Sequence, residues 1–383
     1  LQNDGKIVIA GRTRLVPEQG DMVLFRMNPD GSMDESFGDA GQVRTSFSPY
    51  EDFATALALQ PDGKLVAAGF SITDPSGFPD FDPKFQLVVA RYLENGDLDP
   101  SFGDGGKAAV SHGEILEAHA IVIQPDGRIA VAGASFGYNG NGWDSAVVRF
   151  DSDGSLDESF GQGGIVVTRV GGSVEPGTLC DTRSNWLNSI ALQPDGHLVA
   201  GGYSSTRTGC GDDRFVFTLI RYRPDGSLDP TFSGDGIATE AVAEDCSGPT
   251  CWIDWDEIHS IALQADGRIV AAGYTSNGRE DFRLAILRFL PDGRLDTTFG
   301  ESGRIVGQVD GRSAIANAIA LQENGMIVVS AWLDDGRGGR WAMLRYLNDP
   351  ACAATPRPDC LPGGTAPEVK IYDNALRSRQ RVL

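Results

Sequence analysis

Five polar residues recur at one position of a repeated apolar segment, and their types could support ligand binding. Each stands five residues before a glutamine, among small apolar neighbours: Thr55, His119, Asn188, His259 and Asn317. Alternation along a strand lets this position face a central channel, and a neutral imidazole is a common metal ligand. The functional interpretation is a ring that binds a metal ion or a small polar ligand. The simpler interpretation, which we favour, is a water-filled channel lined by ordinary polar groups.

A second candidate set consists of aromatic residues, several of them next to aspartate, in segments whose length varies between repeats. The set is Phe81, Trp143, Trp186, Trp252 and Trp255. Aromatic platforms with nearby acceptors suit sugars or protein loops. The alternative is that these rings fold back to cover the longer insertions.

A repeated arginine stands eight residues before a repeated aspartate, and a phenylalanine follows three residues later. The pairs are Arg26/Asp34, Arg91/Asp99, Arg149/Asp157, Arg221/Asp229 and Arg288/Asp296. An arginine between apolar strand residues needs a carboxylate partner. Because the pair recurs in every one of these repeats, we predict that it is structural and that the phenylalanine belongs to the core.

Sequence patterns typical of catalysis are absent, including HExxH, GxSxG and the P-loop. The activity of the chain stays open, with a non-enzyme favoured, because some propeller enzymes carry sites at the channel mouth without such motifs. Acidic stretches such as residues 80–82 could hold Ca²⁺, although no D-x-D-x-D-G loop appears. We therefore expect no cofactor.

The cysteines favour an oxidising compartment. All six stand in loop-like sequence outside any CxxC pair: Cys180, Cys210, Cys246, Cys251, Cys352 and Cys360. Cys246–Cys251 and Cys352–Cys360 suit local loops, which leaves Cys180 with Cys210, but the sequence leaves the pairing open. Disulfides predict a secreted or cell-surface protein, and free thiols in the cytosol are the alternative.

These candidates are positioned by a repeat of about sixty residues. Its marker, Gln-x-[DN]-Gly, begins at Gln2, Gln60, Gln124, Gln193, Gln264 and Gln322. Each unit predicts four short strands rich in Val, Ile and Ala, separated by Gly- and Asp-containing turns. Four strands in each of six units predict an all-β fold, a six-bladed β-propeller of four-stranded antiparallel blades with a C-terminal extension.

Length variation is confined to two connections of each unit. The glutamine lies nine residues before the glycine that closes the second strand in the first five units. The loop between the second and third strands and the connection between units vary. In an up-and-down blade these two connections emerge on one face, so we predict one constant face and one variable face that binds partners.

The unit resembles the bacterial delta-sixty repeat of secreted or surface-associated proteins. The QPDG, ARY and LDxSFG motifs carry the resemblance, as at residues 60–63, 90–92 and 98–103. It covers residues 1 to about 347. The resemblance implies a propeller-like fold and brings no catalytic residues.

The repeats predict residues 1–350 as the propeller, with incomplete first and last blades, and 351–383 as a Cys/Pro-rich linker and basic tail. The first unit lacks its first strand and the sixth its fourth. The tail residues Glu368, Val369, Lys370, Ile371 and Tyr372 alternate like a strand. The tail could close its own ring or fill the open blade of another copy, and a fragment of a longer protein is the third alternative.

The formal charge of −21 makes nucleic acid and anionic membranes poor partners. No apolar stretch is long enough for a membrane span. We predict an extracellular, non-enzymatic structural or adhesive propeller that binds a surface protein, a glycan or copies of itself, assembling head to tail into filaments through a donated C-terminal strand. The alternative is a carbohydrate- or metal-binding propeller, including a carbohydrate-active one, with its site at the channel mouth.

Overall fold

The structure is a computed structural model. It describes residues 1–13, 20–74, 84–113, 115–137, 142–171, 183–205, 214–242, 254–276, 282–334, 338–346 and 368–372. Every secondary-structure element within these described residues is a β-strand, so the all-β prediction is confirmed. None of these residues forms a helix that could cross a bilayer.

The chain divides into two compact units, residues 1–200 with 222–228 and residues 201–221 with 229–383. The predicted division at residue 350 stays a prediction. The strands of the first unit are β1 (Ile7–Arg12), β2 (Met22–Met27), β3 (Gln42–Thr45), β4 (Asp52–Leu59), β5 (Leu65–Asp74), β6 (Lys84–Tyr92), β7 (Lys107–Val110), β8 (Ile115–Ile123), β9 (Ile129–Phe136), β10 (Gly142–Phe150), β11 (Ile165–Thr168) and β12 (Arg183–Leu192). The next strand, β13 (Leu198–Ser205), begins in the first unit and ends in the second.

The second unit holds the strands of the later repeats. They are β14 (Arg214–Tyr222), β15 (Ile237–Glu240), β16 (Asp254–Leu263), β17 (Ile269–Ser276), β18 (Phe282–Phe289), β19 (Arg304–Gly307), β20 (Ser313–Leu321), β21 (Ile327–Asp334), β22 (Gly339–Tyr346) and β23 (Glu368–Tyr372).

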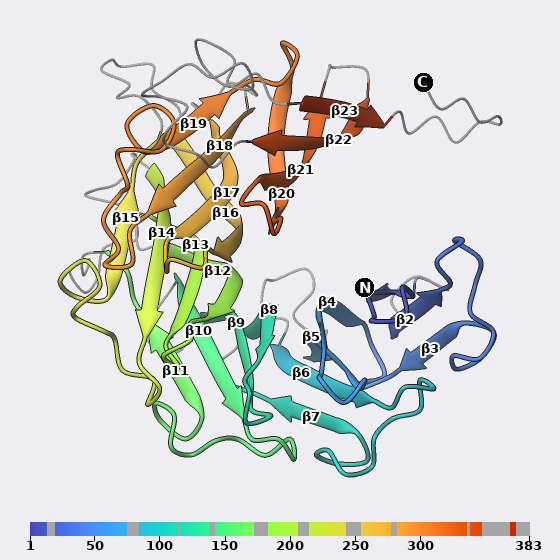
Figure 1. The fold of residues 1–383 in the computed structure, drawn as a ribbon. Coiled ribbons are helices and arrows are strands. Elements are labelled where there is room, and N and C mark those ends of the chain that lie inside the picture. The colour runs from blue at the N-terminus through green and yellow to red at the C-terminus, as the bar shows by residue number, and fades with distance from the viewer. Residues whose placement is uncertain are drawn as a thin grey trace. The chain divides into compact units, whose positions relative to one another are not determined.

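Consecutive strands of one repeat pair antiparallel (Figure 1). In the second repeat β4 pairs with β5, β5 with β6 and β6 with β7. In the third repeat β8, β9, β10 and β11 pair in the same way. The first repeat is a three-stranded sheet of β1, β2 and β3. Short parallel contacts link consecutive repeats, as between β10 and β12 and between β14 and β16.

The Gln-x-Asp-Gly marker forms the turn between the first two strands of a repeat. In the second repeat the Gln60 amide donates to the carbonyl of Lys64 at 2.8 Å, and the Gly63 amide donates to the carbonyl of Gln60 at 3.0 Å. Gly63 has a φ of 86°, a conformation that glycine adopts without the clash a Cβ would bring. The recurrence of the marker is therefore a backbone requirement of the turn.

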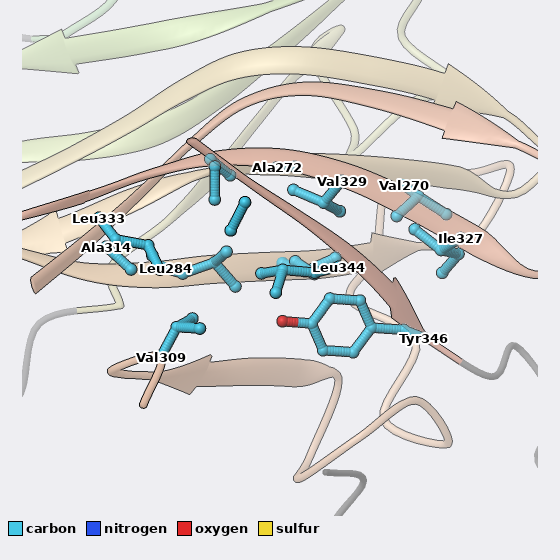
Figure 2. Packing of buried hydrophobic residues seen from close by; sticks show 14 of the residues in the cluster. Val270, Ala272, Leu284, Val309, Ala314, Ile327, Val329, Leu333, Leu344 and Tyr346 are labelled. Atoms are coloured by element: carbon cyan, nitrogen blue, oxygen red, sulfur yellow. The ribbon is translucent and has the colours of Figure 1, made fainter. Parts of the chain in front are cut away.

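Each repeat buries one face of its sheet against the next. Figure 2 shows Val270 and Leu284 of the fifth repeat packed with Ile327, Val329 and Leu344 of the sixth. The same contact joins the second repeat to the third. Repeat proteins gain their stability from such nearest-neighbour contacts, and this packing sets the position of every strand discussed below.

The repeated arginine and aspartate form buried ion pairs, as predicted. Arginine–carboxylate N–O distances are 2.6 Å for Arg26–Asp34, 2.8 Å for Arg91–Asp99, 2.7 Å for Arg149–Asp157, 2.7 Å for Arg221–Asp229 and 2.8 Å for Arg288–Asp296. Each guanidinium also lies over the repeated phenylalanine, with centroid distances of 4.3–4.8 Å. We call this arrangement the arginine clasp.

The arginine clasp also ties a repeat to its successor. Arg149 donates to the carbonyl oxygen of Pro224 at 2.6 Å, and the Gly161 amide donates to the carbonyl oxygen of Asp225 at 2.8 Å. Hydrogen bonds from a charged donor are the stronger kind. Arg149 thus contacts the aspartate and phenylalanine of its own repeat and a carbonyl oxygen of the next repeat. These contacts support the structural interpretation of the charged pair.

A second contact between repeats differs from one pair of repeats to the next. The hydroxyls of Thr45 and Tyr92 lie 2.7 Å apart, and burial raises the pKa of Tyr92 to about 12. In the next pair of repeats Val110 and Phe150 occupy these positions and share one apolar cluster. The hydrogen-bonded pair Thr45/Tyr92 is thus replaced by an apolar pair in the next contact.

We expect Tyr92→Phe to lower the free energy of unfolding by about 1–3 kcal/mol, because the buried Thr45 hydroxyl loses its partner. The double variant Thr45→Val/Tyr92→Phe should recover most of this loss, since it recreates the natural pair Val110/Phe150. Urea unfolding followed by circular dichroism measures both variants. A double variant less stable than Tyr92→Phe would contradict the pairing.

Candidate functional site

Four of the five predicted polar ring residues occupy β-bulges on the first strand of their repeats. The pairing register shifts between Ala54 and Ala56, between Ala118 and Ala120, between Ile258 and Ser260 and between Ala316 and Ala318. The extra residues at these shifts are Thr55, His119, His259 and Asn317. A β-bulge changes the direction in which a side chain points. The position singled out in the sequence therefore marks a backbone geometry that recurs in these repeats.

Glycine stands opposite the bulge in the second, third and fifth repeats, where Gly69, Gly133 and Gly273 pair with the residue before the bulge. A Cβ on Gly69, Gly133 or Gly273 would lie 1.7–1.9 Å from the carbonyl oxygen of the residue two before the ring position. No side chain fits at such a distance. In these three repeats the glycine that closes the second strand is thus explained by close approach of the backbone, whereas the sixth repeat has Ala331 opposite its bulge.

The hydroxyl and amide members of the ring bond to nearby backbone. The Thr55 hydroxyl lies 2.6 Å from the carbonyl oxygen of Ala118, next to the following bulge, and the Asn317 amide donates to the carbonyl oxygen of Ile315 at 3.1 Å. Asn188 is half-buried on β12. These contacts hold the bulges in place, and a ligand-binding role of the full ring stays a prediction.

His119 lies in a cluster with a carboxylate and aromatic rings. Its Nε2 is 3.3 Å from Oε2 of Glu117, and the Glu117 side chain is only 9% exposed. The imidazole centroid is 5.0 Å from Trp186, whose ring is 4.6 Å from Trp143. Phe136 continues the row at 5.4 Å from Trp143. Two separate predictions, the polar ring and the variable-face aromatics, therefore meet here.

A comparable cluster surrounds His259 in the second unit. His259 Nε2 lies 3.5 Å from Oε1 of Glu257. The other carboxylate oxygen accepts hydrogen bonds from the Tyr274 hydroxyl at 2.9 Å and from the Trp255 indole at 3.1 Å. Trp255 in turn packs on Phe215, with centroids 4.4 Å apart. The Glu257 carboxylate is therefore fully supplied with donors.

The electrostatics of the second cluster follow from these donors. Burial opposes ionisation of Glu257, but hydrogen bonds from His259, Tyr274 and Trp255 outweigh it and lower its pKa. Burial and the neighbouring Glu257 charge raise the pKa of Tyr274. Glu257 is thus held as an anion, a state in which it accepts hydrogen bonds and does not donate them.

The two clusters differ in how their carboxylates are satisfied. Ala134 in the third repeat stands where the fifth repeat has Tyr274, and Ile115 stands where it has Trp255. Glu117 therefore lacks two donors that Glu257 has. A buried carboxylate beside an imidazole and two indoles whose planes are tilted by 42° suits a ligand that donates hydrogen bonds and presents an apolar face, as sugars do. We call Glu117, His119, Trp143 and Trp186 the Glu–His–Trp cluster.

Glu117, Glu257 and Tyr274 escaped the sequence analysis. The signal that could have found them is the spacing Glu-x-His, which occurs in the third and fifth repeats alone among the six. Of the predicted set, Phe81, Trp252, residues 80–82 and all six cysteines lie outside the described residues. Among the side chains that are described, no three His, Cys, Asp or Glu groups gather into a set that could hold a metal ion.

The predicted tail strand pairs with the sixth repeat. β23 lies antiparallel to β22, from Arg345↔Glu368 to Trp341↔Tyr372. In every other repeat whose last strand is described, that strand pairs in one register. The residue four positions before the repeated arginine pairs with the last residue of the strand, as in Leu87↔Val110 and Leu284↔Gly307. The tail thus takes the register of the missing fourth strand.

Solved structures with a related arrangement share little sequence with the chain. A mannose phosphorylase from Leishmania mexicana, solved with a phosphate ion, is 11% identical with a TM-score of 0.36, over 74% of this chain and 80% of that one. Hydrazine synthase from Kuenenia stuttgartiensis is 12% identical with a TM-score of 0.40, over 90% of this chain and 44% of that one. A GH32 β-fructofuranosidase from Bombyx mori, solved with sucrose, is 10% identical with a TM-score of 0.34, over 77% and 61%. We assign no substrate or activity from likenesses at this level.

None of the curated proteins compared with the sequence matches it. Five segments match one family of repeats and together cover half of the chain: residues 2–37, 60–102, 124–160, 193–232 and 264–299. Each segment runs from the marker glutamine to the phenylalanine of the arginine clasp. The propeller-repeat resemblance is therefore confirmed, while the narrower likeness to the delta-sixty repeat stays a prediction. The chain belongs to the family described as domain of unknown function (DUF5122) beta-propeller.

Proposed function

We propose that this chain is an extracellular, non-enzymatic structural or adhesive module, built as a six-bladed β-propeller of four-stranded blades, that joins copies of itself head to tail. The observation that carries the proposal is the pairing of β23 with β22. The fourth strand of the sixth repeat comes from the far end of the sequence, across residues 347–367. A strand supplied in this way can be exchanged between copies without loss of a hydrogen bond.

The composition supports a surface or extracellular setting. Six cysteines in loop-like sequence suit an oxidising compartment. A net charge of −21 keeps separate copies soluble and repels anionic surfaces, so contacts between copies must be specific. The arginine clasp, which recurs in five repeats, serves the scaffold, and the sixth repeat, which lacks the phenylalanine of the clasp, is the one that pairs with the tail.

Deletion of residues 367–383 tests the proposal. Its matched control is deletion of residues 373–383, which leaves β23 intact. We expect the longer deletion to lower both the melting temperature and the assembled mass measured by light scattering, because the edge of β22 loses its partner. The shorter deletion should change neither. Unchanged mass and melting after the longer deletion would rule out the donated strand.

The Glu–His–Trp cluster favours a second candidate function, recognition of a sugar or another polar ligand. Its support is the approach of His119 to within 5.0 Å of Trp186, beside the buried Glu117. Titration of the chain with neutral mono- and oligosaccharides, followed by tryptophan fluorescence and calorimetry, tests it. Binding that is lost in Trp186→Ala and kept in Trp332→Ala would support this function, and absence of binding across the sugars would reject it.

A further inference from the structure

Two buried polar side chains of the first unit make no hydrogen bond to the described protein. Asn185 on β12 is 0% exposed and Ser145 on β10 is 1% exposed. Oδ1 and Nδ2 of Asn185 and Oγ of Ser145 are buried, and none has a hydrogen-bond partner among the residues that the structure describes. The large majority of buried side-chain polar atoms in proteins are bonded to protein or to ordered water. These three atoms therefore point to a partner outside the described side chains and backbone.

The repeat pattern brings these two residues to one place, the junction between the third and fourth repeats. The third strand of one repeat and the first strand of the next pair in parallel, and the register is the same here as at the junction between the second and third repeats. In this register Ser145 and Asn185 correspond to Leu87 and Leu116. Those two leucines lie in one apolar cluster. We call Ser145 and Asn185 the Ser–Asn pair.

Buried polar residues at the position of Asn185 in other repeats have partners. The carboxylate of Asp52 in the second repeat accepts a hydrogen bond from the Phe47 amide at 2.8 Å. The carboxylate of Asp256 in the fifth repeat accepts one from the Val242 amide at 2.7 Å. The fold thus places either an apolar residue or a bonded carboxylate here, and Asn185 is neither.

The chemistry of the Ser–Asn pair matches water. An amide group and a hydroxyl group both donate and accept hydrogen bonds, and a buried water molecule typically makes about three hydrogen bonds to such groups. Serine and asparagine are smaller than the two leucines of the preceding junction, so less side-chain volume fills the same register. An ion is a poorer match, because neither side chain of the pair carries a charge.

We propose that the Ser–Asn pair binds internal water, with at least one water molecule that bridges the Asn185 amide group and the Ser145 hydroxyl. The inference is independent of the proposed assembly, since it concerns the inside of one junction. Trp143 precedes Ser145 by two residues and Trp186 follows Asn185 directly. The water site therefore adjoins the Glu–His–Trp cluster.

A crystal structure of the intact chain, at a resolution that shows ordered waters, tests the site directly. We expect a water molecule within about 2.5–3.2 Å of both Ser145 Oγ and an amide atom of Asn185. The double variant Ser145→Leu/Asn185→Leu recreates the natural pair Leu87/Leu116 and should show no water at this place. A structure of the unaltered chain in which Ser145 and Asn185 bond to each other or to other protein groups, with no water between them, would overturn the inference.

Melting followed by circular dichroism gives a second readout. Replacing both polar partners by apolar groups is nearly neutral or stabilising, so the double variant should melt no lower than the unaltered chain. Asp52→Leu is the matched control, because it changes the equivalent position where the carboxylate has protein partners. It should melt lower by at least about 2–4 °C, since the Phe47 amide loses its acceptor.

The two readouts together decide the inference. A double variant that melts as far below the unaltered chain as Asp52→Leu would overturn it, because such a loss would mean that the protein itself supplies the partners of the Ser–Asn pair. The assembled mass of the double variant should equal that of the unaltered chain. Failure of the water site would therefore leave the proposed assembly standing.

Discussion

Replacement of Asp157 by alanine is expected to lower the free energy of unfolding by about 3–5 kcal/mol, the usual cost of leaving a buried charge without its partner. Arg149 is 3% exposed, and its Nε lies 2.7 Å from the Asp157 carboxylate. Arg128 contacts the same carboxylate at 3.2 Å, and the Ser159 hydroxyl lies 2.6 Å from it. The change therefore removes the shared acceptor of three donors and leaves a guanidinium buried between repeats.

An exposed ion pair of the same chain is the control for this prediction. Arg312 lies 3.0 Å from Asp310, whose side chain is 61% exposed. Asp310→Asn should cost less than about 1 kcal/mol, because water already solvates both charges and asparagine tolerates the left-handed backbone at this position, where φ is 53°. Chemical denaturation at pH 7 measures both variants. Equal losses for Asp157→Ala and Asp310→Asn would contradict the structural role of the arginine clasp.

Acid should destabilise the protein through all five clasps together. The pKa values of Asp34, Asp99, Asp157, Asp229 and Asp296 are all lowered. At Asp157 burial raises the pKa, but hydrogen bonds from Ser159 and Arg149 outweigh that effect. The folded carboxylates therefore bind protons less readily than the same groups in the unfolded chain.

The sign of the effect follows from this difference. Above about pH 5 these carboxylates are ionised in both states, so their contribution to stability is complete. As the pH falls through about 4, the ordinary value for aspartate, the unfolded chain takes up protons first and the free energy of unfolding drops. Denaturant unfolding at pH 7, 5, 4 and 3 should show a plateau and then a steep decline. Asp157→Ala should decline less steeply, and equal stability at pH 3 and pH 7 would contradict the prediction.

The repeat signals in the sequence were sufficient to predict the local scaffold. The spacing of Arg149 and Asp157 predicted a buried pair because a charge between apolar strand residues has few other partners. The marker at Gln60 predicted a turn because glycine at Gly63 allows a backbone that other residues avoid. Both inferences depend on neighbours within one repeat, where sequence distance and spatial distance agree.

Features that depend on stacking between repeats could not be predicted in the same way. Thr55 looked free to line a channel, yet its hydroxyl reaches a carbonyl of the next repeat, at Ala118. The meeting of His119 with Trp186 also joins two repeats, and its geometry depends on a bulge that leaves no composition signal.

The tail strand is the feature that links the fold to the proposed assembly. The arginine clasp recurs in the first five repeats, whereas the sixth repeat has no phenylalanine at the clasp position and pairs β22 with β23 of the tail.

The mass of the intact chain in solution tests this central claim most directly. Light scattering with negative-stain imaging, across a hundredfold range of concentration at neutral pH, should show oligomers or filaments whose mass rises from that of one 40.8 kDa chain. Elongated particles that grow from both ends without closing are the expected form. A single species of 40.8 kDa at every concentration would contradict the account.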